Sequence, residues 1–347
     1  MVRGKSSISA FLVTALMLLA FTCSFSGLAF AETANTAKTE QIKLFEQRIR
    51  SLRTLQIPII DVEHHWGSKH TLQELARKMD KNGVALTWLG PNEKLGDEYS
   101  LQANQSYPDY FVPTSIHGDG PLWHGKNTDL LKKISSDVRS GQYFAMGEFE
   151  ARHYPSGTND RNVHLPLTSE SFRVIFSLSQ ETGIPFLVHH EAEDAMLPEM
   201  ETMLKEYPNA NVIWCHVGRN RNPLTWSKFN TPDTVRQLLQ KYPNLYFDLV
   251  QSPPGAKYRL TGYVEGIMYD LSNNHVKLDR RWRKLFIDYA DRFVIGSDVN
   301  GGRWDNYDSV FQTFRDIVLN DLPQDVAEKI AFKNAWHLMT GQAWNND

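Results

Sequence analysis

The feature that most restricts the fold of this chain is a series of eight short apolar runs separated by stretches with helical periodicity. Most of the runs are continuously apolar, which is typical of parallel strands covered on both faces. Helix start signals lie between them, including a capping box that begins at Thr71 and a threonine cap followed by Pro232. The predicted strands are Ile57–Glu63, Val84–Leu89, Tyr110–Pro113, Tyr143–Phe149, Pro185–His189, Asn211–His216, Leu245–Val250 and Arg292–Gly296.

This alternation predicts an α/β protein, with a (β/α)8 (TIM) barrel as the leading architecture and its chemistry at the C-terminal strand ends. An open doubly wound sheet is the alternative. Such sheets usually carry a glycine-rich phosphate loop after the first strand, whereas here that strand runs into Glu63-His64-His65. We expect long surface loops over Gly90–Asp129. The predicted helices are Gln41–Leu52, Thr128–Arg139, Ser169–Thr182, Pro198–Tyr207, Asp279–Tyr289, Asn306–Asn320 and Gln324–Thr340.

The N-terminus has the order of features found in a secretory signal peptide. Arg3 and Lys5 precede an apolar stretch over residues 8–30, which ends in a small-x-small pattern at Ala31. We therefore predict cleavage after Ala31 and a periplasmic or secreted location. A retained membrane anchor is the alternative because the stretch could nearly span a bilayer, although polar residues dilute it. Lipidation at Cys23 is less favoured because the residues before it fit a lipidation site poorly.

The chain has 347 residues, of which 41% are hydrophobic, and this is enough for one sizeable core. We expect a signal peptide over residues 1–31, an N-terminal linker and helix over 32–56, and a single barrel domain over 57–347. Within the second segment, the small and polar stretch Glu32–Glu40 is predicted to be a disordered linker.

Composition limits the partners of the mature chain. Cleavage would leave Cys215 as its one cysteine, which excludes an intramolecular disulfide. The formal net charge is −3 at pH 7 and there is no basic tract, so we expect no nucleic-acid partner. No second apolar span follows, so we expect no stable membrane association after cleavage. A small-molecule substrate is the expected partner, and a homo-oligomer remains open.

Five of the predicted strands end in residues that can bind a metal ion. Residues two apart in a strand share a face, so Glu63 and His65 should both point into the barrel mouth while His64 points away. A carboxylate and an imidazole at this spacing suit zinc, manganese or a similar divalent ion. The other candidates are Glu148, His189 (favoured over His190 by its place at the strand tip), His216 and Asp298.

The order and spacing of these fragments resemble the amidohydrolase superfamily, specifically its amidohydrolase-related (amidohydrolase 2) branch, from about Pro58 to Met339. The fragments are Ile-Asp-Val-Glu-His-His, Met-Gly-Glu-Phe-Glu, Phe-Leu-Val-His, Trp-Cys-His-Val-Gly, Tyr-Pro-Asn-Leu-Tyr-Phe-Asp, Ile-Gly-Ser-Asp and Lys-Asn-Ala. The resemblance implies a metal-dependent barrel of the hydrolase type. It implies that Glu63 and His65 are first-strand metal ligands, that His189 and His216 are ligands or substrate-polarising groups, and that Asp298 is a ligand and general base.

One departure from the family pattern affects the expected reaction. The usual first-strand signature is His-x-His, whereas this chain has Glu63-His64-His65, similar to aromatic-acid decarboxylases of the same branch. A carboxylate ligand lowers the net charge of the site, which weakens its Lewis acidity and favours manganese more than an all-imidazole site would. We therefore expect Zn²⁺ or Mn²⁺, as one or two ions.

The remaining candidates have two interpretations each. Glu148 lies where many two-metal members have a bridging lysine or glutamate, so it could bridge two ions or only hydrogen-bond to His189. Arg219 and Arg221 could clamp a substrate carboxylate or be ordinary loop charges. Cys215 is expected to face away from the mouth and to serve in packing. Further candidates that the spacing does not distinguish are Glu150, Arg303 and the loop histidines His117, His124, His153 and His164.

The sequence thus predicts an exported metal-dependent hydrolase. The ion would lower the pKa of a water molecule, Asp298 would accept its proton, and the hydroxide would attack an ester, lactone or amide carbonyl. His216 would polarise the carbonyl oxygen or complete the metal shell. Two alternatives stay open, a metal-dependent non-oxidative decarboxylase of an aromatic or related acid and a non-catalytic ligand-binding barrel.

Overall fold

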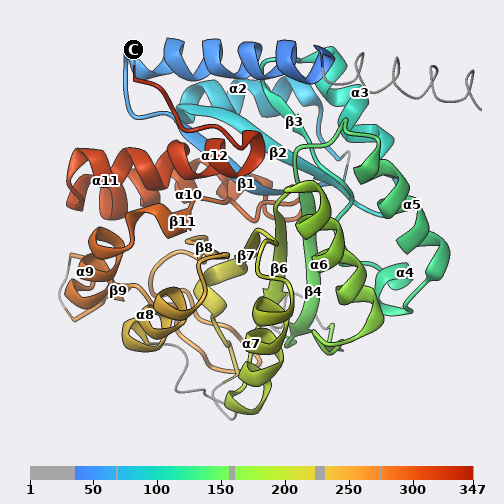
Figure 1. The fold of residues 1–347 in the computed structure, drawn as a ribbon. Helices are drawn as coiled ribbons and strands as arrows, with labels where there is room; N and C mark the ends of the chain where they lie inside the picture. The colour runs from blue at the N-terminus through green and yellow to red at the C-terminus, as the bar shows by residue number, and fades with distance from the viewer. Residues whose placement is uncertain (1–35, 68, 156–160, 223–230, 273–274, 347) are drawn as a thin grey trace, which may run out of the picture.

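Parallel strands alternate with helices along the chain, and the helices pack around the outside of the strands (Figure 1). The computed structural model describes residues 36–67, 69–155, 161–222, 231–272 and 275–346. The predicted signal peptide and its cleavage site lie outside these residues. An N-terminal helix covers residues 36–53, so the linker predicted for Glu32–Glu40 is wrong from residue 36 onward.

The barrel strands form two sheets, and β9 (Tyr269–Asp270) and β10 (Lys277–Leu278) form a separate antiparallel pair. The first contains β1 (Ile59–Trp66), β2 (Val84–Pro91) and β3 (Phe111–Pro113), all parallel. All eight predicted strands are confirmed, within a few residues at their ends. The second sheet contains, in spatial order, β11 (Phe293–Val294), β8 (Leu245–Asp248), β7 (Val212–Trp214), β6 (Phe186–His190), β4 (Met146–His153) and the short antiparallel β5 (Val163–His164).

Parallel bridges join the two sheets at both edges. Asp61 pairs with Ile295 at one edge, and Thr114 pairs with Ala145 at the other. At the first edge the carbonyl oxygen of Glu63 also accepts hydrogen bonds from the backbone N–H groups of Ser297, at 3.1 Å, and Asp298, at 2.8 Å. The eight parallel strands therefore follow one another in a ring, as the predicted (β/α)8 barrel requires.

At least one helix follows each barrel strand, and all the predicted helices are present. The capping box at Thr71 forms, and the cap at Thr231 accepts a hydrogen bond from the backbone of Thr234. The region predicted as loops over Gly90–Asp129 contains two helices that the sequence analysis missed, α3 (Glu98–Ser106) and α4 (Pro121–His124). The other helices are α2 (Leu72–Asn82), α5 (Thr128–Arg139), α6 (Glu170–Thr182), α7 (Leu197–Glu206), α8 (Pro232–Lys241), α9 (Arg280–Asp288), α10 (Tyr307–Thr313), α11 (Gln324–Glu328) and α12 (Asn334–Thr340).

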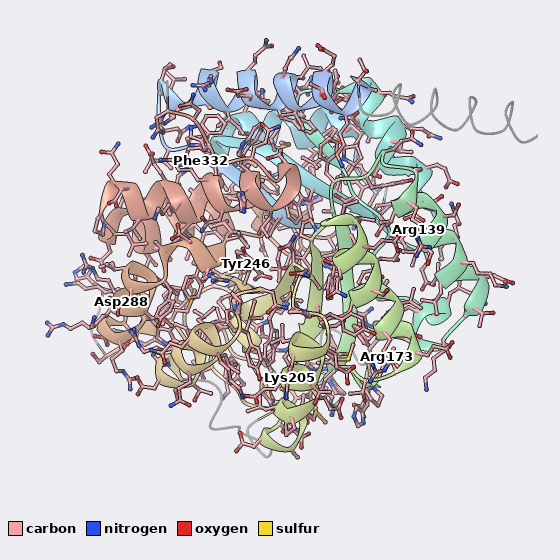
Figure 2. The ribbon with its side chains drawn as sticks, in the orientation of Figure 1. Arg139, Arg173, Lys205, Tyr246, Asp288 and Phe332 are labelled. Carbon is pink, nitrogen blue, oxygen red and sulfur yellow. The ribbon has the colours of Figure 1, made fainter. Side chains whose placement is uncertain are left out.

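The outer helices carry charged side chains on the periphery, such as Arg139 and Asp288, whereas Phe332 is buried (Figure 2). The N-terminal helix lies beside the C-terminus (Figure 1). There the guanidinium of Arg50 donates to the carbonyl of Asn345 at 3.0 Å and lies over the ring of Trp344. Within the described ranges, no helix is both long enough and apolar enough to cross a membrane.

Candidate active site

Six of the predicted side chains meet at the C-terminal ends of the strands. His65 Nε2 lies 3.1 Å from Glu148 Oε2 and 3.4 Å from Asp298 Oδ1. Across the barrel, His216 Nε2 lies 3.0 Å from His189 Nδ1 and 3.9 Å from Glu63 Oε1. The structure therefore brings together every side chain for which the sequence predicts metal binding: Glu63, His65, Glu148, His189, His216 and Asp298.

The local backbone explains how the residues reach the centre. Alternation along β1 points Glu63 and His65 inward, as predicted, while His64 is buried on the other side, 3.4 Å from Ser297 Oγ. His216 and Asp298 both adopt the left-handed conformation, with φ of 58° and 48°. Non-glycine residues in this region are strained, and such strain is concentrated at functional sites.

Glu63 is the most unfavourably placed of these groups. Its carboxylate is fully buried, and neither oxygen has a hydrogen-bond partner among the described residues. Burial raises the pKa of Glu63 well above its ordinary value, and the neighbouring carboxylates of Glu148, Asp248 and Asp298 raise it further. A buried carboxylate without donors is costly, and a cation among these oxygens would remove that cost.

The three imidazoles are oriented as metal ligands are. Each ring has one nitrogen facing the centre and the other facing an acceptor outside it. A proton on the outer nitrogen leaves the inner nitrogen with a free lone pair, as a metal ligand requires. The outer contacts are His65 Nδ1 to Asp119 Oδ2 at 3.6 Å, His189 Nε2 to Glu191 Oε1 at 3.2 Å, and His216 Nδ1 to the Val250 carbonyl at 3.2 Å.

These donors fit a divalent cation. Several sets of three have ligand atoms within 4.8 Å of one another, and the sets share members. Imidazole and carboxylate donors suit zinc, manganese and similar ions. His65 Nε2 is a further buried atom without a hydrogen bond within the described residues, although Glu148 lies in ion-pair range. The three sets nearest the centre are Glu63–His216–Asp298, Glu148–His189–His216 and His65–His117–Glu148.

Asp298 is held by Arg303, which donates from Nη1 to Oδ2 at 2.7 Å. Burial alone would raise the pKa of Asp298, but the charge and hydrogen bonds of Arg303 hold it below the ordinary value for an aspartate. Asp298 therefore stays ionised near neutral pH, and it lines the pocket above the centre. An ionised carboxylate in this position can bind a cation or accept a proton.

A pocket of about 600 Å³ opens above the centre. His65, Glu148, His189 and Asp298 form its floor, and its walls carry Arg219 and Arg221, the two predicted carboxylate clamps. Each of these arginines is already paired with a buried carboxylate. Arg219 Nη1 lies 2.5 Å from Glu265 Oε2, and Arg221 pairs with Glu191. Both residues are therefore placed at the pocket, with their charges largely neutralised by the protein.

The expectation for Cys215 is corrected by the structure. Its sulfur lies with the carboxylates of Glu63 and Asp248, directly beside the centre. The strand alternation used for the prediction fails here because the chain leaves β7 through two left-handed residues, His216 and Val217. Burial raises the pKa of the Cys215 thiol well above its ordinary value, which agrees with the prediction that it is no nucleophile.

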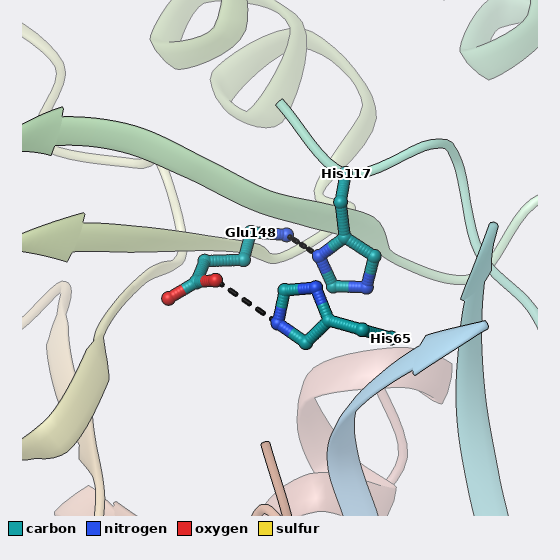
Figure 3. Close-up of side chains that lie close together, drawn as sticks. All are labelled: His65, His117 and Glu148. Carbon is teal, nitrogen blue, oxygen red and sulfur yellow. Dashed lines mark hydrogen bonds and ion pairs between the residues drawn. The ribbon is translucent and has the colours of Figure 1, made fainter. Parts of the chain in front are cut away.

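Two loop residues beside the centre, Asp119 and Glu191, were not identified from the sequence, and His117 was one of several loop histidines that the spacing did not distinguish. Asp119 and Glu191 contact the outer nitrogens of two imidazoles, and His117 Nδ1 accepts the backbone N–H of Glu148 at 2.9 Å (Figure 3). The carboxylate of Glu150, a weaker candidate, instead pairs with His124 at 2.8 Å and with Arg161 at 2.6 Å. Of the four histidines predicted to lie in loops, His124 ends α4, His153 ends β4 and His164 ends β5, so the prediction holds for His117 alone. The rings of His117 and His153 stack on the rings of His65 and His189.

Comparison with known proteins identifies the family. No curated protein matches the chain. A crystal structure of an amidohydrolase II is 15% identical, with a TM-score of 0.50, and the match covers 81% of this chain and 99% of that chain. A putative amidohydrolase from Staphylococcus aureus and a zinc-bound amidohydrolase from Burkholderia multivorans are each 11% identical, with TM-scores of 0.51 and the same two coverages.

At these identities the solved structures show the fold alone, and this fold is the amidohydrolase barrel predicted from the sequence. The sequence pattern of the amidohydrolase family matches residues 142–338, which is more than half of the chain. The matched range includes His189, His216 and Asp298. The chain therefore belongs to the amidohydrolase family and is an enzyme of the metal-dependent hydrolase type.

Proposed function

We propose that this protein hydrolyses an ester, lactone or amide bond of a small molecule, using a divalent cation held by Glu63, His65, His189 and Asp298. The observation that carries the proposal is the buried carboxylate of Glu63, which has no hydrogen bond within the described residues and lies 3.6 Å from His65 Nε2, a buried nitrogen that also has none. When bound, a divalent cation lowers the pKa of water and polarises a carbonyl group. His216 lies close enough to complete the same ligand set.

The protein's own groups supply the proton transfers and the positioning. Asp298, kept ionised by Arg303, accepts a proton at its carboxylate. Glu148 turns one oxygen toward His65 and the other toward His189, at 3.1 Å and 2.8 Å. The contact with His189 is a hydrogen bond, and the two oxygens of Glu148 would also be placed to bind two ions.

Metal content and reaction products test the proposal together. The purified mature chain should contain one or two equivalents of zinc or manganese by elemental analysis. It should release acid from a panel of lactones, esters and amides, and removal of the metal should abolish this activity. A protein that carries no divalent metal after reconstitution, or a metal-loaded protein that cleaves none of these bonds, would contradict the proposal.

Decarboxylation of an aromatic or related acid is the second candidate function. Glu63 favours it, because a carboxylate replaces the first histidine of the usual His-x-His signature. The two reactions differ in their products. Release of carbon dioxide from aromatic acids, without cleavage of lactones or amides, would establish the second function in place of the first.

We also propose that the enzyme is exported, because the positive, apolar and small-residue segments of its N-terminus follow the order of a signal peptide. Expression of the full chain in bacteria followed by cell fractionation tests this. The mature protein should appear in the periplasm with Glu32 as its first residue by mass spectrometry. An intact N-terminus in the cytoplasmic fraction would contradict export.

A further inference from the structure

Behind His189, on the side away from the centre, lies the buried carboxylate of Glu191. The Oε1 atom of Glu191 is 3.2 Å from His189 Nε2. The other ring nitrogen, Nδ1, lies 2.8 Å from Glu148 Oε1 and 3.0 Å from His216 Nε2. The side chain of Glu191 is almost completely buried, so water does not compete for this contact. His189 is therefore held between the centre and one fixed acceptor.

Glu191 is in turn fixed by Arg221. Arg221 Nε donates to Oε1 at 3.0 Å, and the backbone N–H of Arg221 donates to Oε2 at 3.0 Å. The backbone N–H of Tyr154 donates to Oε1 at 3.2 Å. These donors come from the segments after β4 and β7 and enclose the carboxylate. Glu191 thus cannot turn away from the ring without losing hydrogen bonds in a dry site, which is costly.

We propose that Glu191 is a positioning residue of the metal centre. It accepts the Nε2 proton of His189, which keeps Nδ1 unprotonated and aimed at the cation, and Arg221 acts by holding Glu191. This inference rests on the proposed metal-dependent function and adds a role outside the ligand set. It also gives Arg221 a task other than binding a substrate carboxylate. Carboxylates that orient a ligand histidine raise the basicity of that ligand and fix its tautomer.

The chain provides a matched control close by. Arg219 and Glu265 form a second buried pair of the same kind, with side chains 3% and 0% exposed. Glu265 has contacts with Tyr263 and the backbone of Gly266. Within the described residues, the hydrogen bonds of the Glu265 side chain go to Arg219, Tyr263 and Gly266 and not to the three imidazoles. Replacing Glu265 by glutamine therefore removes the charge of a buried pair without touching a metal ligand.

The test uses cobalt(II) as the probe, because its absorption spectrum reports ligand geometry. Wild-type protein, Glu191→Gln and Glu265→Gln are stripped of metal, reloaded with cobalt(II) and titrated against a chelator. Glu191→Gln should bind cobalt(II) about 10- to 100-fold more weakly than wild type and show a changed absorption band. Glu265→Gln should match wild type in affinity and spectrum.

Each other outcome is decisive. Wild-type affinity and an unchanged spectrum in Glu191→Gln would overturn the inference and leave the proposed function standing. An equal loss in Glu265→Gln would overturn it as well, because the effect would then belong to any buried pair near the pocket. Failure of the wild type to bind cobalt(II) would refute the proposed function and this inference with it. Should Glu191→Gln fail to fold, Arg221→Lys takes its place, since lysine keeps the charge but loses the forked contact with Glu191.

Discussion

The imidazole of His117 stacks on the imidazole of His65, with ring centroids 3.9 Å apart and planes 21° from parallel (Figure 3). His117 also accepts the backbone N–H of Glu148, so one loop side chain supports site residues from two strands. Burial, followed by the charge of His65, lowers the pKa of His117 to about 4. The supporting ring is therefore neutral at physiological pH and adds no charge to the centre.

Displacing His117 without changing any site residue should weaken metal binding. A Cβ atom on Gly90 would lie 1.8 Å from His117 Nε2, so Gly90→Ala must move the ring. We expect an affinity for zinc lower by about tenfold, within the range for lost outer contacts of metal sites. Gly67→Ala is the control, because its new Cβ would meet nothing closer than 3.4 Å. Equal chelator-competition constants for the two variants would exclude a supporting role for His117.

Asp298→Asn should remove turnover and preserve the fold. Asparagine tolerates the left-handed backbone at this position as well as aspartate does, so the local conformation should survive. Loss of a proton acceptor predicts a kcat lower by about 10²- to 10⁴-fold. Steady-state kinetics and thermal unfolding measure the two effects. Asp129→Asn, at an exposed position of α5, is the control and should match wild type. Wild-type kcat in Asp298→Asn would remove this carboxylate from the mechanism.

Glu63→Gln should stabilise the metal-free protein while weakening its metal site. The raised pKa of Glu63 means that its charged form opposes folding, so stability is greatest below the ordinary glutamate pKa and falls as pH rises. At pH 8 the neutral glutamine removes a penalty of about 1–3 kcal/mol. Differential scanning calorimetry of the metal-free proteins should show a higher Tm for the variant. With excess zinc the order should reverse, and a lower metal-free Tm for the variant would contradict this account.

Metal affinity should rise with pH across the neutral range. Burial opposes charge on His189, but Glu148 and Glu191 raise its pKa to about 9 in the metal-free protein. A ligand imidazole must be unprotonated, so below that pH the cation has to displace a proton. Displacement of one proton predicts about a tenfold gain in affinity per pH unit. Titrations between pH 6 and pH 8 in a non-coordinating buffer measure the slope, and a flat profile would show that His189 is already neutral.

The barrel was predictable because most of its strands are continuous apolar runs in the sequence, such as Pro185–Val188. Helix α3 could not be predicted in the same way, because the residues that it buries are Ser100 and Ala103. Small and polar residues on the inner face leave no hydrophobic periodicity to read. Short helices whose buried face is small and polar are therefore the part of the fold that the sequence does not reveal.

The convergence of the proposed ligands was predictable for a related reason, because alternation along a strand determines which side chains at its C-terminal end point toward the barrel mouth. Asp119 and Glu191 could not be predicted in this way, because they lie on loops, where side chains do not alternate. Their contacts with the imidazoles join residues that lie on different segments of the site. Cys215 shows the limit of the alternation rule, which holds only while the backbone stays extended. At the next residue, His216, the backbone adopts the left-handed conformation and changes direction, so the alternation of the strand no longer applies.

The backbone contact between Glu63 and Asp298 joins the first barrel strand to the last. The proposed cation-binding groups are thus distributed along the chain from residue 63 to residue 298. A chain that ends before residue 293 would lack both the closing strand β11 and the carboxylate of Asp298. We therefore expect the full set of proposed ligands to assemble only after residues 293–298 have been synthesised, and a product truncated before them should have an open barrel edge and an incomplete metal site.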